Sequence, residues 1–318
     1  MKTDTVKLQR KNLMTDSMKL QRKMRIKENI PLYSMLILPL LVFAIFSYGP
    51  MFGLVIAFKD YRFIDGIMGS EWVGLRNFRM IFAQPQTVGI IRNTLVISLL
   101  TLVTSFPFPI ILAILLNEVR SKFFKKATQT VLYLPHFFSW IIVGGIIINI
   151  FSTNNGPINF IIEALGGTPF QFMFNHTSWM SIYLGAGIWK DTGFNTIIYL
   201  AALSSIDPSY YEAAVVDGAN KWKQITKITI PCLIPVIVLQ FILATGKIME
   251  VGFDRIYVLQ NAMVRDISDV VSTYIYEFGI QSGNFSITTA MGLFDSVISL
   301  TLVLLANQIA KKSDNALF

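Results

Sequence analysis

Three charged residues lie near the middle of long apolar blocks of the sequence, where a charge is costly unless it has a use. Lys190 and Asp191 fall near the middle of one block and Asp295 near the middle of another. At bilayer depth each charge costs on the order of 3 kcal/mol on insertion scales, so such groups usually face a partner or a water-filled path. With polar neighbours on the same helical faces, the candidate translocation path comprises Trp189, Lys190, Asp191, Thr192, Asp295 and Ser299. A structural ion pair of Lys190 with Asp191 or Asp295 is the alternative, and both stay open.

A polar segment with helix-ending signals separates two of the apolar blocks. Asp207 can cap a helix, and Pro208 suits a first turn, where no backbone donor is needed. Gly218 tolerates the left-handed conformation that often follows a helix C-terminus. Between them, residues 212–214 (Glu-Ala-Ala) combine a charge with two small side chains that let another surface approach closely. The pattern predicts a short docking helix.

The remaining reactive residue types form no constellation that could catalyse a reaction or hold a metal. Ser204 and Ser205 have no histidine near them, and the two histidines, His136 and His176, stand far apart without ligands at metal-binding spacing. Cys232 is the only cysteine, and Thr-Gly-Lys at 245–247 lacks the spacing of a phosphate-binding loop. The chain is therefore expected to be no enzyme and to bind no metal and no cofactor itself.

The elements that position these residues are long apolar helices. Of the 318 residues, 53% are hydrophobic and 14% charged, against about 25% charged in a typical soluble protein. Six blocks reach the ~20 apolar residues needed to cross a bilayer; they run approximately over 33–58, 90–116, 127–150, 178–203, 228–249 and 287–309. The sequence predicts an all-α, multi-pass membrane protein with six transmembrane helices.

Prolines and glycines interrupt most of these blocks. Pro107 and Pro109 fall in the second block, Pro135 in the third, and glycines 185, 187 and 193 in the fourth. Such residues are tolerated at depth where neighbouring helices or water satisfy the freed backbone groups. Ordinary bundle packing explains any single one, whereas their recurrence favours a transporter over a simple anchor.

The distribution of basic residues sets the orientation. Residues 1–29 form a basic arm with nine Lys or Arg, further basic clusters fall at 120–126, 221–227 and 311–312, and residues 151–177 contain none. By the positive-inside rule both termini lie in the cytoplasm. The net charge of +8 is thereby explained by topology, so nucleic acid is not expected as a partner. The arm is expected to contact anionic lipid headgroups.

The docking segment matches a known motif. Glu212-Ala213-Ala214, Gly218, Ile228 and Ile230-Pro231 fit the EAA motif of permease subunits in ATP-binding-cassette (ABC) importers that depend on a substrate-binding protein. Tyr48-Gly49-Pro50-Met51 and Leu134-Pro135-His136 are similar to permeases for complex oligosaccharides. The chain therefore resembles the carbohydrate branch of that superfamily along nearly its whole length beyond the basic arm.

The resemblance implies a permease domain over residues 30–318 with the type I importer fold and a cytoplasmic coupling segment at 205–231. It implies a second, homologous permease as heterodimer partner, two ATPase subunits that bind ATP and Mg²⁺, and an extracytoplasmic sugar-binding protein. It also implies residence in the bacterial cytoplasmic membrane and import of a sugar, in particular an oligosaccharide. By motif match, the ATPase-coupling residues are Tyr211, Glu212, Ala213, Ala214, Asp217 and Gly218.

Three other functions fit the sequence less well. An ion-coupled secondary transporter needs a buried titratable relay, for which only Lys190, Asp191 and Asp295 are available. A membrane-embedded enzyme needs clustered His, Asp or Glu on facing helices, and the sequence offers no such pattern. A sensory or structural membrane protein would copurify with no ATPase.

Overall fold

The computed structural model describes residues 29–311, and its chain divides into two compact units between Val55 and Ile56. The first unit contains α2 (Ile30–Phe43), the π-helical turn η1 (Ala44–Tyr48) and most of the 3-10 helix η2 (Gly49–Phe58). Helix α2 carries no charged residue along its length, which is the composition of a membrane-spanning helix. The predicted basic arm at 1–29 lies almost wholly outside the described residues.

The second unit opens with a small ordered cap. Strand β1 (Lys59–Asp60) pairs antiparallel with β2 (Glu71–Trp72), with α3 (Gly66–Gly69) between them and α4 (Arg76–Ala83) after them. The buried Asn77 side chain donates from Nδ2 to the carbonyls of Ala57 and Lys59, each at 2.9 Å. These bonds tie α4 to the hairpin.

Prolines break two of the expected spans, as the sequence predicted. Helix α5 (Pro85–Ser105) is followed by α6 (Pro107–Glu118), which begins at the first proline of the second apolar block. Helix α7 (Lys122–Tyr133) and the 3-10 helix η3 (Leu134–Phe137) meet α8 (Trp140–Ile150) at a bend of 98°. Pro107 and Pro135 lie in the first turns of α6 and η3. Proline suits a first turn because no backbone donor is needed there.

Glycines do not interrupt the helix of the fourth expected span. After α9 (Pro157–Ala164), helix α10 (His176–Ser204) runs uninterrupted for 29 residues. Two of its glycines serve close packing instead. A Cβ at Gly193 would collide with the backbone carbonyl of Leu132 on α7, and one at Gly187 would collide with the guanidinium of Arg255.

The chain then turns back through the predicted docking segment. Helix α11 (Ser209–Val216) leads into α12 (Lys221–Gln224), η4 (Ile225–Thr229) and α13 (Ile230–Gly246). An ordered segment follows, with α14 (Phe253–Leu259), α15 (Arg265–Ser268), α16 (Val271–Tyr274) and η5 (Ile275–Gln281). The described chain ends with the long helix α17 (Phe285–Lys311).

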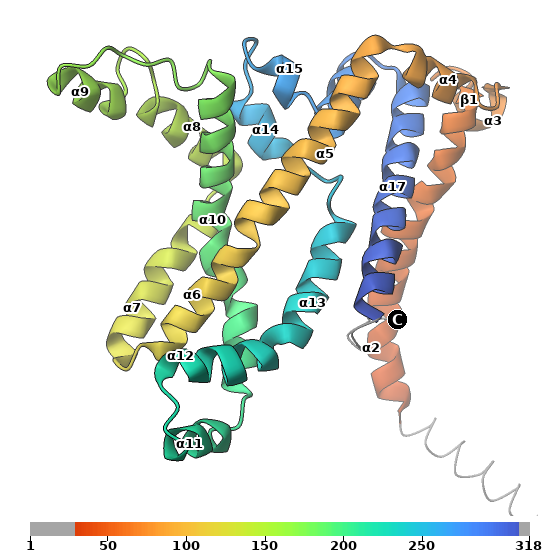
Figure 1. The fold of residues 1–318 in the computed structure, drawn as a ribbon. Coiled ribbons are helices and arrows are strands. Elements are labelled where there is room, and N and C mark those ends of the chain that lie inside the picture. The colour runs from red at the N-terminus through yellow and green to blue at the C-terminus, as the bar shows by residue number, and fades with distance from the viewer. Residues whose placement is uncertain (1–28, 312–318) are drawn as a thin grey trace, which may run out of the picture. The chain divides into compact units, whose positions relative to one another are not determined.

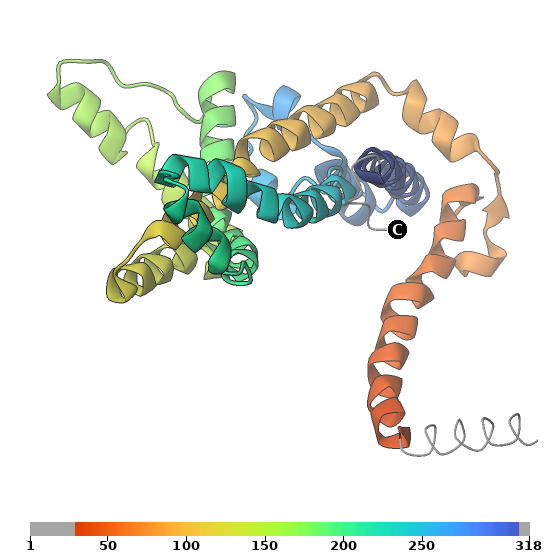
Figure 2. The same ribbon diagram turned by 60° about the horizontal axis from the view of Figure 1, so that its bottom comes forward.

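Within the second unit, α11 and the turn between α6 and α7 lie at one end, and α15 and α4 lie at the other (Figure 1). Figure 2 shows this unit from the α11 end, where α12 lies beside the end of α6; the ion pair of Lys221 with Glu118 joins them at 2.9 Å. Helix α10 packs against α5, α6, α7 and α13. It is thus the central helix of this unit.

Length and composition support fewer spans than the six predicted. Within residues 29–311, four helical stretches are long and apolar enough to cross a membrane: 32–58, 85–118, 221–246 and 285–311. The bent pair of 122–137 and 140–150 would make a fifth. The remaining expected span corresponds to α10, which has the length but carries Lys190 and Asp191.

Candidate functional site

Helix α11 is closed at both ends by local hydrogen bonds. At its start, Asp207 Oδ1 accepts from the backbone N–H of Ser209 at 2.9 Å, so the carboxylate caps the helix although it lies one residue before the N-cap, Pro208. That bond lowers the pKa of Asp207 below its ordinary value. At its end, Gly218 has φ +72°, as predicted. Gly218 N–H donates to Val215 and Ala219 N–H to Ala214, which is the Schellman arrangement.

Side chains from the following turn hold α11 on its support. The Tyr211 hydroxyl lies 3.0 Å from Thr229 Oγ1 on η4. Gln224 Nε2 donates to the carbonyl of Ala219 at 3.0 Å, and Asn220 Oδ1 accepts from Lys223 N–H to cap α12. Helix α11 is therefore attached to a hydrogen-bonded turn and not to an irregular loop.

The outward face of α11 is apolar and unusually open. Glu212 and Ala213 are exposed, Val216 is 86% exposed, and Trp222 just beyond the helix is 71% exposed. No side chain of α11 is buried. An open apolar surface beside a carboxylate has the composition of a contact site for another protein.

Lys190 and Asp191 come together, in the ion pair that was the alternative to a path. The Lys190 ammonium, 7% exposed, lies 3.9 Å from Asp191 Oδ1 and donates to the carbonyl of His136 at 2.8 Å. Asp191 Oδ1 also lies 3.1 Å from Nδ1 of His136, whose ring stacks on Phe194. This cluster joins α10 to η3 at the bend before α8.

The other path candidates do not gather around that pair. Trp189 is 53% exposed, and Thr192 has a buried hydroxyl without a hydrogen-bond partner among the described residues. Asp295 on α17 is half-buried, and its Oδ1 likewise has no such partner; Ser299 is half-buried one turn further on. The role of these residues in a path stays a prediction.

A cavity of about 550 Å³ lies elsewhere, between α5, α6, α10, α13 and the start of α14. None of the six candidate path residues lines it. Hydroxyl and amide groups dominate its polar lining, which comprises Ser98, Thr101, Ser105, Tyr183, Asn195, Tyr199 and Gln240. Three charged residues complete it: Lys247, Glu250 and Arg255. A mixture of apolar walls with a few polar groups is typical of small-molecule sites.

Arg255 is the buried charge of this cavity. The residue is 6% exposed, and its Cζ lies 3.4 Å from the centroid of the Tyr183 ring and 5.4 Å from that of Trp140. Its Nε and Nη2 find no hydrogen-bond partner among the described residues. Gly187 leaves room for the guanidinium against α10.

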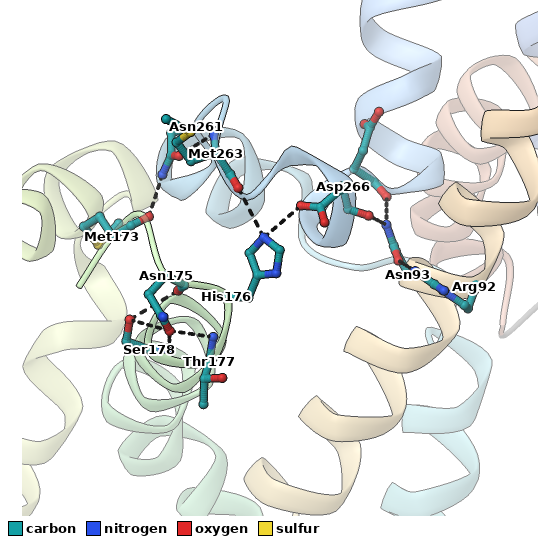
Figure 3. A network of polar contacts seen from close by, with 11 residues as sticks. Arg92, Asn93, Met173, Asn175, His176, Thr177, Ser178, Asn261, Met263 and Asp266 are labelled. Carbon is teal, nitrogen blue, oxygen red and sulfur yellow. Dashed lines mark hydrogen bonds and ion pairs between the residues drawn. The ribbon is translucent and has the colours of Figure 1, made fainter. Parts of the chain in front are cut away.

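Hydrogen bonds clamp the segment that carries Arg255 to α10 and α5 (Figure 3). His176 Nε2, at the start of α10, lies 3.1 Å from Asp266 Oδ1 and 3.2 Å from the carbonyl of Met263. Asn93 on α5 donates to the carbonyl of Asp266 at 2.7 Å. On α14 itself, the carbonyl of Leu259 accepts from the indole of Trp179 at 2.8 Å.

Sequence reasoning missed Arg255 and the hydroxyls of α5. Arg255 falls in a mixed-charge segment outside the apolar blocks, so burial at bilayer depth gave no signal for it. The hydroxyls of Ser98, Thr101 and Ser105 did leave a signal. They recur at spacings of three and four in an apolar block, which places them on one helical face.

Comparison with known proteins gives a family match over most of the chain. The family model described as "Binding-protein-dependent transport system inner membrane component" matches residues 105–315. That range includes α11 and every cavity-lining element except α5, of which it includes only Ser105.

Two curated relatives come from Bacillus subtilis strain 168. The polygalacturonan/rhamnogalacturonan transport system permease protein YteP is 44% identical over 281 residues, covering 88% of each chain. Protein LplB is 42% identical and covers 89% of each. Among solved structures, a chain of a bacterial alginate ABC transporter in complex with an alginate pentasaccharide-bound periplasmic protein is 40% identical, with a TM-score of 0.84. The match covers 92% of this chain and 98% of that one.

Proposed function

Because this chain belongs to the family of binding-protein-dependent transport system inner membrane components, we propose that it carries oligosaccharides through the membrane as the permease subunit of an ATP-driven ABC importer. It is a multi-pass membrane protein and a translocation component, not an enzyme. The observation that carries the proposal is the similarity to the alginate importer chain, which extends over 92% of this chain at a TM-score of 0.84. The names of YteP and of the alginate transporter support a saccharide substrate.

We propose α11 as the coupling helix. An ATPase subunit would receive Glu212, Ala213 and Ala214 in a surface cleft, and Tyr211, Asp217 and Gly218 would hold the helix in shape. Support comes from the open apolar face of α11 and from its caps at both ends. A rigid, capped helix transmits a displacement of its partner to η4 and α13, whereas a frayed loop would absorb it.

For the topology we propose six spans with both termini in the cytoplasm. The bent pair of α7 and α8 would count as one span, and helix α10 would be the span that length and composition do not identify. A polar central helix is compatible with crossing because its neighbours surround it on several sides. Single cysteines in a Cys232→Ser background, labelled from either side of sealed vesicles, test this: a thiol at residue 216 should react from the cytoplasmic side and one at residue 165 from the other.

The proposed assembly contains a second, homologous permease, two ATPase subunits and an extracytoplasmic sugar-binding protein. ATP and Mg²⁺ would be bound by the ATPase subunits and not by this chain. The solved alginate transporter, which contains a saccharide-bound periplasmic protein, supports the binding-protein partner. We place the complex in the bacterial cytoplasmic membrane, in contact with lipid along its apolar helices.

Affinity purification of the tagged chain, followed by reconstitution, tests the function. We expect a homologous permease and an ATPase to copurify, and proteoliposomes with the binding protein to take up labelled oligosaccharide only with ATP inside. The rival is an ion-coupled transporter. Uptake that needs no ATPase and stops when an ionophore collapses the ion gradient would establish the rival and refute the importer.

A further inference from the structure

We propose that Arg255 binds a carboxylate of an acidic oligosaccharide as it passes through the cavity between α5, α10 and α13. The inference rests on the proposed import function and adds to it the charge class of the cargo and the residue that reads it. It starts from a guanidinium that is buried, that lines a cavity and that has donors left over.

A buried guanidinium without an anionic partner is an expensive arrangement. Arginine is almost never fully buried unless it is paired, and each unmade hydrogen bond of a charged donor costs free energy. Yet among residues 29–311 no carboxylate lies within ion-pair distance of Arg255. The nearest candidate on α10, Asp191, is already engaged by His136 and Lys190. Contacts with the Tyr183 and Trp140 rings stabilise the cation but leave Nε and Nη2 without acceptors.

The donors that are left have the geometry of a carboxylate fork. Nε and one Nη of a guanidinium donate in parallel, and this pair matches the two oxygens of a carboxylate. A single neutral hydroxyl accepts only one of the two bonds, and two neighbouring hydroxyls that together accept both carry no charge to neutralise the guanidinium. The arrangement therefore favours a uronate residue over a neutral hexose.

Charge in the rest of the cavity does not cancel Arg255. Lys247 and Glu250 are the other charged lining residues; they have opposite signs, and both are exposed. The wall consequently carries one net positive charge, located on the residue that is shielded from solvent. A charge in such a site is screened by salt much less than an exposed charge.

The opposite wall offers partners for sugar hydroxyls. Ser98, Thr101 and Ser105 line the cavity from one face of α5, and none of their buried hydroxyls has a hydrogen-bond partner among the described residues. Hydroxyls donate and accept, so they suit the hydroxyl groups of a pyranose ring. A polyhydroxylated carboxylate would supply hydrogen-bond partners both to the unpaired hydroxyls on one wall and to the unpaired guanidinium nitrogens on another.

The comparison proteins are consistent with this charge class. The polysaccharides named for YteP contain galacturonate, and a second solved chain, 41% identical with a TM-score of 0.83, comes from an importer of "the acidic polysaccharide alginate". These names describe those proteins. For this chain, an acidic cargo is inferred only from Arg255, whose Nε and Nη2 lack acceptors.

The test uses the complete importer in proteoliposomes with its binding protein. We compare uptake of trigalacturonate with uptake of its methyl ester, each loaded onto the binding protein beforehand, for the wild type, Arg255→Met and Arg255→Lys. The acid-to-ester ratio within one preparation cancels differences in the amount of folded complex. We expect Arg255→Met to lower this ratio about tenfold or more, because bonds to a charged group are lost, and Arg255→Lys to lower it less.

Arg265→Met is the matched control. It removes a cation from the same outer segment, but one that is exposed and already paired with Asp269 and Glu277. Its acid-to-ester ratio should equal that of the wild type. An equal ratio in the wild type and Arg255→Met would overturn the assignment of Arg255 and leave the importer in place. A wild-type complex that imports no saccharide with ATP would overturn the importer itself.

A second measurement bypasses the binding protein. In the Cys232→Ser background, an Asn195→Cys thiol, at an exposed position that lines the cavity, can be labelled with a water-soluble maleimide in the full complex, with the product read on this chain by mass spectrometry. Trigalacturonate should protect the thiol at a concentration about tenfold lower than its ester does. Adding Arg255→Met should make the two protect alike. Equal protection with Arg255 intact would count against the proposal.

Discussion

The proposed coupling helix α11 and the cavity wall differ in where their charges lie. Glu212 on α11 is exposed, and local bonds along eight residues give its helix shape. Arg255 is buried, and its position depends on bonds from α10 and α5, whose residues lie more than 70 positions away in the sequence. Helix α11 is shaped by bonds between near neighbours and is exposed to a partner. The cavity wall is formed by helices distant in the sequence, and it contains a buried guanidinium with two nitrogens that lack an acceptor.

This difference separates two kinds of functional surface in one chain. A helix that docks into another protein needs small side chains and firm ends, which a short stretch of sequence can supply. A site that holds a passing solute needs groups from several directions, so no single stretch contains it. We expect substitutions on α11 to act on coupling and those around Arg255 to act on selectivity.

The largest effect is expected from bulk on the coupling helix. Ala213→Trp puts a large side chain where close docking is required, and overpacking a fitted surface costs ~1–3 kcal/mol. Uptake should fall about tenfold to hundredfold, while basal ATPase activity of the complex persists. Transport and ATP hydrolysis are measured on the same proteoliposomes.

Ala164→Trp is the control for that experiment. It makes the same change on α9, which also has eight residues and also exposes the alanine, but which is not part of the coupling segment. Uptake should stay near that of the wild type. If Ala213→Trp transported normally, α11 would not be the helix that couples the two activities.

A smaller effect should distinguish the partnered buried cation from the unpartnered one. Lys190 and Arg255 both lie over the Trp140 ring, but only Lys190 has a carboxylate within ion-pair distance, and it also donates to the carbonyl of His136. Lys190→Met should destabilise the complex by about 1–3 kcal/mol and leave the acid-to-ester ratio unchanged. Thermal unfolding and the uptake ratio measure the two. A changed ratio at unchanged stability would instead assign Lys190 to the path.

The C-terminal cap of α11 should contribute less. Gly218→Ala places a Cβ at φ +72°, which costs about 1 kcal/mol relative to glycine. Coupling efficiency, measured as sugar imported per ATP hydrolysed, should drop modestly. Gly89→Ala on α5, where a Cβ meets nothing within 4 Å and φ is not positive, should leave it unchanged. Equal behaviour of the two variants would show that the cap does not matter for coupling.

The smallest effect concerns the N-terminal cap. Since the bond from Ser209 lowers the pKa of Asp207, the cap contributes above the ordinary Asp pKa, and its contribution is lost as pH falls through the lower value of the folded state. Hydrogen-exchange protection of α11 should therefore decrease on acidification below about pH 4. Asp207→Asn can still accept the bond without titrating, so its protection should not show this step. A step that persists in Asp207→Asn must come from another group.

Local patterns determined much of the fold correctly. The caps and Gly218 predicted α11 to within two residues, because its hydrogen bonds are made within the segment. The prolines at 107 and 135 predicted the helix breaks, since a missing N–H acts locally. The sequence could not show what the glycines of α10 do, because a glycine's role depends on what packs against it, and in this case a neighbouring backbone and a guanidinium do.

The charged residues within the apolar blocks predicted less of the candidate site than the local patterns predicted of the fold. The sequence placed Lys190 and Asp191 in one block, and proximity was enough to pair them. It could not indicate that neither would line the cavity, or that Asp295 would not line it either. Which side chains face one another depends on how each helix is rotated about its axis and on the angle at which helices cross. The hydrophobic period of a sequence indicates only which side of a helix faces lipid or core.

By itself, then, the sequence determined the membrane class, the apolar helices and the short capped helix α11, because these follow from composition and from bonds between near neighbours. Only the tertiary structure decided that α10 is continuous and central, that three hydroxyls of α5 face a cavity, and that Arg255 is buried there without an acceptor. The physical reason is the distance along the sequence over which each interaction acts. Capping and hydropathy act within a few residues, whereas a cavity and the charge on its wall exist only where helices distant in the sequence pack side by side.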